Sequence, residues 1–277
     1  MKRLILWVSA DQEAFLEEWL WNQGVLSVSS RPQYVAERCL EALVEDEAAS
    51  ALKQAARELS WMGRPTTEKV YIETVDEQEW QVRWRDNFQM IQVGRLRLAG
   101  EWERIEADET TLLIYPGQAF GTGQHETTQM ILGRLQEMNL AGKRVLDAGC
   151  GTGILAIAAE RLGAGFVFGF DADPVCRENM EHHLAMNRTQ KTRLAIGTLN
   201  DFEHEPYDLI LANITLNVLR ELWPRFRTLL KPGGVLLSSG LLSEQMAEAV
   251  SLLEAEGFAV GERRVKGEWC LLEALLP

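Results

Sequence analysis

One short stretch, residues 145–154, constrains the fold of this chain more than any other. An apolar run leads into three glycines at alternate positions, Gly149, Gly151 and Gly153, and an apolar helical pattern follows directly. Glycines at this spacing allow a sharp turn and let a ligand approach bare backbone amides that side chains would otherwise cover. The stretch therefore predicts a strand, a ligand-binding turn and a helix within an α/β domain.

From residue 144 onward the sequence alternates between strand and helix patterns. Apolar runs predict strands at 144–147, 166–171, 193–196, 207–213 and 234–239. Apolar residues at helical spacing predict helices at 153–162, 175–187, 217–230 and 243–256. Residues 259–265 and 268–274 predict a terminal hairpin. This alternation predicts a parallel sheet with helices on both faces, in a Rossmann-like α/β fold.

The first part of the chain predicts a second, smaller domain. Strand patterns occupy 2–8, 25–29 and 70–75, helical patterns occupy 9–24 and 46–61, and 34–44 fits either a strand or a helix. Two strand-helix-strand passes predict a small ferredoxin-like α/β module.

A charged segment follows this module, with Trp80 and Trp84 four residues apart, which predicts a connecting helix. We expect a recognition domain at 1–75, a linker helix at 76–92 and the ligand-binding domain at 93–277. Within the latter, 94–98 and 111–115 predict short β segments ahead of the main sheet.

Charge and cysteine usage narrow the function. Lys and Arg number 28 and Asp and Glu number 41, which gives a net charge of −13. This balance argues against direct nucleic-acid binding and favours a basic protein partner. Four widely separated cysteines without metal-ligand spacing indicate reduced thiols in a cytoplasmic protein and predict no metal site. The apolar runs are too short to span a membrane, so we expect no membrane contact.

The residues around the turn select among ligands. A phosphate-binding loop would need a Gly-Lys-Ser/Thr ending, which 153–155 lacks, and the glycine spacing differs from the dinucleotide fingerprint. Asp147, two residues before the first glycine, would repel an anion and attract an ammonium or sulfonium group. The D-x-G-x-G-x-G order therefore favours S-adenosylmethionine, and a nicotinamide-dependent oxidoreductase is the more distant alternative.

Two side chains at the ends of neighbouring predicted strands extend this site. Asp171 lies 22 residues after Gly149, a separation at which a strand-end carboxylate reaches the hydroxyls of a bound ribose. Asp173, followed by proline, better suits a helix cap. Asn213 ends an apolar strand at the carboxyl edge, where open α/β sheets bind ligands.

The most specific motif is the segment from Pro116 to Thr128. Together with residues 146–159 and Asn213-Ile214, it resembles the lysine methyltransferases of the stalk-base protein, the eleventh protein of the bacterial large ribosomal subunit. The resemblance covers roughly residues 75–277 closely and the earlier residues more loosely. It implies a class I S-adenosylmethionine-dependent methyltransferase domain.

The resemblance also implies roles for individual residues. It places Thr128, Gly149, Asp171 and Asn213 at the cofactor, and Phe120 in a loop that covers the cofactor. With Asp147, Gly151 and Gly153 these form the predicted cofactor site. It further implies that the N-terminal domain recognises the ribosomal protein and that the linker lets the two domains reorient.

The histidines suggest no catalytic base. His125 lies in the cofactor loop and could titrate near neutrality, but we favour a role in organising the loop by hydrogen bonding. The pair His182-His183, in an amphipathic helix, predicts a surface feature. No catalytic residue is assigned, because positioning a neutral amine is the main requirement of the reaction.

The sequence therefore predicts a cytoplasmic, monomeric protein N-methyltransferase. It would transfer methyl groups from S-adenosylmethionine to lysine side chains of the stalk-base protein, free or on the ribosome, with the N-terminal amine as an additional candidate. Two alternatives stay open at this point. One is a lysine methyltransferase of another protein, such as the electron-transfer flavoprotein β subunit, and the other is a non-catalytic cofactor-binding module on ribosomes.

Overall fold

The chain divides into two compact units, Met1–Asn87 and Phe88–Pro277. The computed structural model describes residues 2–9, 13–25, 27–34, 37–44, 46–58, 70–74, 88–103, 105, 107–115 and 120–277. Most of the predicted linker helix at 76–92 lies outside these residues. Its last part is not helical: Ile91 and Val93 belong to strand β5 (Ile91–Val93), because they pair with Leu98 and Leu96 in an antiparallel hairpin within the second unit.

The first unit has the predicted ferredoxin-like topology. Its elements are β1 (Lys2–Ser9), α1 (Glu13–Asn22), β2 (Ser27–Tyr34), β3 (Glu37–Val44), α2 (Asp46–Glu58) and β4 (Val70–Thr74). The antiparallel sheet has the order β2-β3-β1-β4. The segment that fitted either state is a strand, because Leu40, Ala42 and Val44 alternate into the core while Glu41 lies between them.

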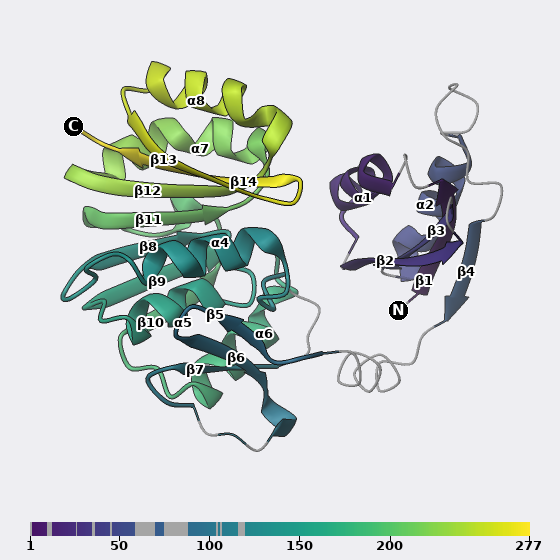
Figure 1. The fold of residues 1–277 in the computed structure, drawn as a ribbon, viewed down its shortest axis with the longest axis horizontal. Helices are drawn as coiled ribbons and strands as arrows, with labels where there is room; N and C mark the ends of the chain where they lie inside the picture. Colours follow the sequence, from purple (N-terminus) through teal and green to yellow (C-terminus); the bar gives the residue numbers. More distant parts are fainter. Residues whose placement is uncertain are drawn as a thin grey trace. The chain divides into compact units, whose positions relative to one another are not determined.

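The second unit is built on a seven-stranded sheet (Figure 1). Its strands are β8 (Arg144–Ala148), β9 (Phe166–Asp171), β10 (Thr192–Ile196), β11 (Tyr207–Asn213), β12 (Leu230–Leu242), β13 (Ala259–Lys266) and β14 (Trp269–Leu275). The order is β10-β9-β8-β11-β12-β14-β13, with the first five strands parallel and β14 antiparallel to both of its neighbours. The predicted parallel sheet and terminal hairpin are therefore confirmed.

Helices cover both faces of this sheet (Figure 1). They are α4 (Glu126–Leu135), α5 (Ile154–Arg161), α6 (Cys176–Met186), α7 (Leu216–Leu229) and α8 (Met246–Ala255). Helices α4 and α5 contact each other, as do α7 and α8. Trp223 and Phe226 of α7 pack with Ile210 of β11 and Leu236 of β12 in the core beneath α7 and α8. Among the described residues, no helix has the length and apolar character that crossing a membrane requires.

A small sheet, β5-β6-β7, precedes the main one. Strand β6 (Leu96–Gly100) begins later than the predicted segment at 94–98, because Gly94 forms the hairpin turn with a φ of 56°. Strand β7 (Thr111–Ile114) packs against α5 and α6. Its Leu113 exchanges two backbone hydrogen bonds with the Asn187 side chain, at 2.9 and 3.0 Å.

The strand order reverses between β8 and β11, which lie side by side in the middle of the sheet. Successive strands run outward from β8 to β10 in one direction and from β11 to β12 in the other. At such a switch point the connections leave a crevice outside the carboxyl ends of the strands, where open α/β sheets bind ligands. The glycine turn after β8 and Asn213 at the end of β11 both lie at this edge.

Candidate functional site

The glycine turn connects β8 to α5 in the conformation that its sequence predicts. Gly149, Gly151 and Gly153 have φ values of 68°, 51° and 80°, in the left-handed region that favours glycine. A Cβ on Gly151 would lie 2.2 Å from the backbone oxygen of Phe120. The backbone of Phe120 therefore lies directly against the turn, and glycine is required for this close approach.

Asp171, at the end of β9, is tied to the same turn. Its Oδ2 accepts a hydrogen bond from the Gly151 N–H at 2.8 Å, and its Oδ1 accepts one from the Asp173 N–H at 3.0 Å. Burial raises the pKa of Asp171 above its ordinary value. An ionised carboxylate has about four lone-pair positions, so acceptor capacity is left for further donors such as hydroxyls. The Asp173 Oδ1 accepts from the Val175 N–H at 2.9 Å in the turn before α6, whose own N-cap is Val175, so Asp173 caps that turn and not the helix itself.

Asp147 is a buried carboxyl group with one unused oxygen. Its side chain is fully buried in β8, and its Oδ2 accepts a hydrogen bond from the Ala156 N–H in the first turn of α5 at 3.0 Å. Its Oδ1 has no hydrogen-bond partner among the described residues. Burial raises the pKa of Asp147 to about 7. A buried acceptor of this kind calls for a donor or a cation from a bound molecule.

Asn213 and Thr128 meet across the carboxyl edge, although 85 residues separate them in the chain. The Asn213 Nδ2 donates a hydrogen bond to the Thr128 Oγ1 at 3.3 Å. Thr128 is fully buried in α4, and the Asn213 Oδ1 has no hydrogen-bond partner among the described residues. Asp147 and Asn213 lie on adjacent strands, since Asp147 pairs with Leu211 two residues before Asn213. Two unsatisfied acceptors therefore lie close together at one edge.

An aromatic cluster flanks this edge. Phe120, which is 38% exposed, lies with its ring centroid 5.4 Å from that of His125, and His125 lies 4.7 Å from Trp269 at the start of β14. His125 is the N-cap of α4, where its Nδ1 accepts from the Thr127 N–H at 3.3 Å. Burial lowers the pKa of His125. This hydrogen bond agrees with the predicted organising role.

The prediction for His182-His183 is wrong for one of the two residues. His182 is 43% exposed and pairs with Glu101 at 3.0 Å, whereas His183 is completely buried. Asn179 and Met180, four and three residues earlier on α6, are also buried. This helical spacing is the signal that could have placed His183 on the inner face.

Thr152 is a second residue that the sequence analysis missed. It is completely buried within the glycine turn, and its hydroxyl donates to the backbone oxygen of Gly121 at 2.8 Å. The turn and the loop after Phe120 are thus joined by a side chain as well as by close packing.

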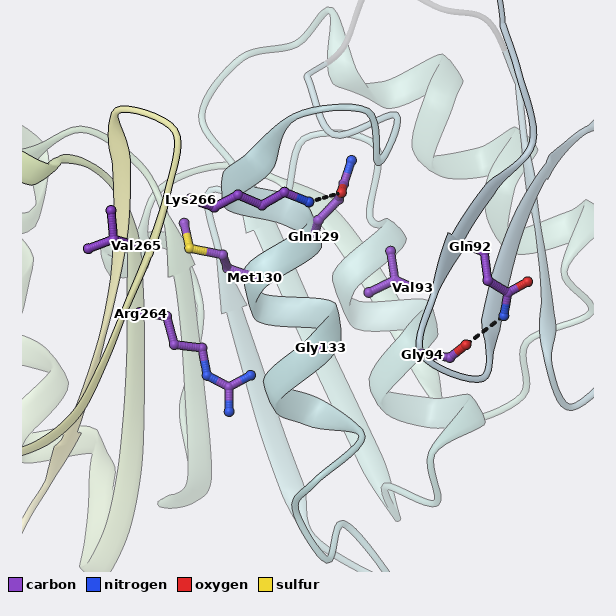
Figure 2. Close-up of a pocket in the computed structure, with 9 residues that line it drawn as sticks. All are labelled: Gln92, Val93, Gly94, Gln129, Met130, Gly133, Arg264, Val265 and Lys266. Carbon is purple, nitrogen blue, oxygen red and sulfur yellow. Dashed lines mark hydrogen bonds between the residues drawn. The ribbon is translucent and has the colours of Figure 1, made fainter.

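A hollow of about 580 Å³ lies elsewhere on α4 (Figure 2). It is lined by residues of the β5-β6 hairpin, of α4 and of β13, and by none of the predicted cofactor residues. Two of its cations already have partners: Lys266 donates to the Gln129 Oε1 at 2.5 Å, and Arg264 pairs with Glu262 at 2.7 Å. The hollow is therefore separate from the candidate site and presents little uncompensated charge.

Comparison with known proteins decides the identity of the fold. A family model described as ribosomal protein L11 methyltransferase (PrmA) matches residues 8–275. The chain belongs to this family. It is therefore an S-adenosylmethionine-dependent methyltransferase, as the glycine turn and the motif at Pro116 to Thr128 predict.

Individual relatives of the L11 methyltransferase family span most of the chain. The ribosomal protein L11 methyltransferase of Azotobacter vinelandii is 32% identical over 97% of this chain and 96% of that protein. That of Limosilactobacillus fermentum is 35% identical over 79% of this chain and 70% of that protein. The crystal structure of ribosomal protein L11 methylase from Lactobacillus delbrueckii subsp. bulgaricus has a TM-score of 0.62 at 28% identity, covering 68% of this chain and 98% of that one. These relatives support neither of the alternative functions nor an oxidoreductase.

The residues at the edge suit the cofactor of an L11 methyltransferase. S-adenosylmethionine carries an ammonium group, a sulfonium group and ribose hydroxyls, all of which need acceptors or negative charge. The unused oxygens of Asp147 and Asn213 and the remaining lone pairs of Asp171 supply such acceptors. The acceptor set of the site is thus complementary to the chemistry of this molecule.

Proposed function

We propose that this enzyme methylates lysine side-chain amines of ribosomal protein L11, with the N-terminal amine as an additional target. The observation that carries the proposal is the match to the L11 methyltransferase family over 8–275, which includes both units of the chain. The acceptor-rich edge at β8, β9 and β11 supplies a matching cofactor site.

Eight residues would hold the cofactor in this proposal: Phe120, Thr128, Asp147, Gly149, Gly151, Gly153, Asp171 and Asn213. S-adenosylmethionine, when bound, supplies a methyl group on a sulfonium that a nitrogen displaces in line. The glycines place no side chain between the turn and the cofactor, and Asp171 is held in place by the Gly151 N–H. The Asn213 Nδ2 donates to Thr128, which leaves the Asn213 Oδ1 oriented by that bond and free to accept a hydrogen bond.

Positioning accounts for the reaction without a strong base. A lysine with a pKa of about 10.4 costs about 4 to 5 kcal/mol to deprotonate at pH 7. Holding the reacting groups in line can contribute about 7 to 11 kcal/mol. His125, whose pKa burial lowers, remains a neutral cap of α4 and is assigned no proton transfer.

Residues 1–75 are the proposed substrate-recognition domain, and the linker at 76–92 is proposed to let this domain reorient relative to the methyltransferase domain. The net charge of −13 favours a basic protein as partner, whether free or on the ribosome. We place the enzyme in the cytoplasm as a monomer that makes no direct contact with nucleic acid or membrane.

The proposal is tested with recombinant enzyme and radiolabelled S-adenosylmethionine. Undermethylated ribosomal protein L11 and the electron-transfer flavoprotein β subunit are offered in parallel, and mass spectrometry locates the modified amines. We expect label on lysines of L11 alone. Label on the flavoprotein but not on L11 would overturn the substrate assignment, and absence of any transfer by an enzyme that binds the cofactor would favour the non-catalytic module.

A further inference from the structure

Two buried residues, Thr152 and His183, connect the Phe120 loop, residues 120–125, and the end of strand β7 to the glycine turn. Each polar group of Thr152, in the glycine turn, forms a hydrogen bond. Its N–H donates to the backbone oxygen of Phe120 at 2.9 Å, and its hydroxyl donates to the backbone oxygen of Gly121 at 2.8 Å. Its own backbone oxygen lies 2.9 Å from the Nδ1 of His183. Phe120 and Gly121 are therefore fixed to the turn by two hydrogen bonds from one residue.

His183 connects the turn to Tyr115, the residue that follows strand β7. Its Nε2 lies 2.7 Å from the backbone nitrogen of Tyr115, which donates to it. Because the Nε2 is an acceptor, the ring proton resides on the Nδ1 and is donated to the Thr152 oxygen. The ring is completely buried, and burial lowers its pKa to about 4, so the neutral form that both bonds require is present at pH 7.

The two residues form one connected unit from β7 through α6 to the glycine turn. Breaking it would release the Phe120 loop while leaving the hydrogen bonds of Asp147 and Asp171 in place, since those run to Ala156, Gly151 and Asp173. Phe120 and Gly121 are thus joined to the turn by a residue outside the predicted cofactor set.

We propose that Thr152 and His183 are positioning residues, which hold the Phe120 loop against the glycine turn so that it is in place for cofactor binding. This inference rests on the proposed placement of the cofactor at that turn. It assigns a functional reason for a threonine inside the turn and for a completely buried histidine on α6.

The test uses Thr152→Val, which has nearly the same shape but lacks the hydroxyl, and Thr152→Ser as the matched control that keeps it. Cofactor affinity is measured by calorimetry on the full chain, with KM for S-adenosylmethionine, kcat and the unfolding midpoint of the free enzyme measured in parallel. We expect Thr152→Val to weaken cofactor binding about 10-fold and to raise KM, and Thr152→Ser to stay within about 2-fold of the parent, as expected for loss of one buried hydrogen bond. Since Thr152 acts through the loop, its substitution should have no further effect on affinity in a Phe120→Ala background.

Two other outcomes separate the possible errors. If Asp171→Ala weakens binding while Thr152→Val lowers only the unfolding midpoint, the cofactor placement stands and the positioning role is refuted. If Asp171→Ala leaves the affinity unchanged, the placement of the cofactor itself is wrong. His183→Gln, whose side-chain oxygen can still accept from the Tyr115 N–H but which loses the bond to Thr152, is expected to weaken binding less than Thr152→Val, and a larger loss at unchanged stability would contradict the proposed link.

Discussion

Cofactor binding is expected to release a proton from Asp147. This carboxyl group is completely buried, only its Oδ2 has a hydrogen-bond partner, and burial raises its pKa to about 7. In the free enzyme at pH 7, about half of the molecules therefore carry the protonated form. A cation of the cofactor beside the unused Oδ1 favours the ionised form and lowers the pKa.

The size of the effect follows from that pKa. About one tenth of the enzyme carries the ionised carboxylate at pH 6 and about half carries it at pH 7, and a ligand that requires this form binds only that fraction. Affinity should therefore rise about 5-fold between these values, or about 1 kcal/mol. Affinity should rise and not fall with pH, because the pKa of Asp147 in the folded enzyme is raised and the ligand prefers the deprotonated form. At pH 7 binding should release about half a proton.

Calorimetry in two buffers of different protonation enthalpy measures this release directly. Asp147→Asn is the control, since the amide does not titrate, and its affinity should not change between pH 6 and pH 7. S-adenosylhomocysteine keeps the ammonium group and lacks the sulfonium charge, so equal proton release with both ligands would identify the ammonium as the neighbour of Asp147. Identical heats in both buffers, or an unchanged pH dependence in Asp147→Asn, would refute the reasoning.

Three further perturbations have defined expectations. Gly149→Val places a branched side chain where the Cβ already lies 2.5 Å from the Cγ2 of Ile214 at a φ of 68°, so cofactor affinity should fall more than about 10-fold in calorimetry. His183 has a folded pKa of about 4 against about 6.5 when unfolded. The contribution of His183 to the free energy of unfolding is therefore complete above pH 6.5. It should fall by about 3 kcal/mol towards pH 4, as measured by urea unfolding. Arg134→Met removes the bidentate pair to Glu273, whose closest distance is 2.6 Å and whose side chains are 17% and 14% exposed, and should cost about 2 kcal/mol of unfolding free energy.

Each of these three predictions has a control variant. Gly142→Ala has a similar φ of 71° but no atom within 4 Å of the added Cβ, so it reports backbone strain without a clash. Equal losses of affinity in this variant and in Gly149→Val would contradict the steric argument. The contribution of His183 to the pH dependence of the unfolding free energy is obtained as the difference between the parent and His183→Gln. Taking this difference cancels the opposite contribution of Asp147, which both proteins share. A double variant with Glu273→Gln should recover part of the loss caused by Arg134→Met.

The sequence allowed the fold class and most of the site to be predicted, because these depend on local patterns. Glycine adopts positive φ without steric cost, which allows the left-handed turn at Gly149, Gly151 and Gly153, and the apolar periodicities identified the strands from β8 to β14 and the helices between them. Element ends were less accurate. Strand β12 begins at Leu230 and ends at Leu242, well beyond the predicted 234–239, because its pairing with β11 and β14 extends the ladder.

Interactions between distant segments were decided only by the tertiary structure. The contact of Asn213 with Thr128 joins residues from β11 and α4, and no local pattern encodes their distance. The burial of His183 depends on which face of α6 packs against β7 and the glycine turn, so a helical pattern with several polar residues left it ambiguous.

The sequence by itself determined the glycine turn and the Rossmann-like fold class and predicted S-adenosylmethionine as the ligand, since the turn needs only neighbouring residues with the right backbone freedom. Only the tertiary structure decided the surroundings of that turn. Asp147 has an oxygen without a hydrogen-bond partner among the described residues, Thr152 bonds to the backbone of Gly121, and a buried neutral His183 bonds to Thr152. These features arise from burial and hydrogen bonding between segments far apart in the chain. Such contacts exist only once the sheet and its helices have assembled.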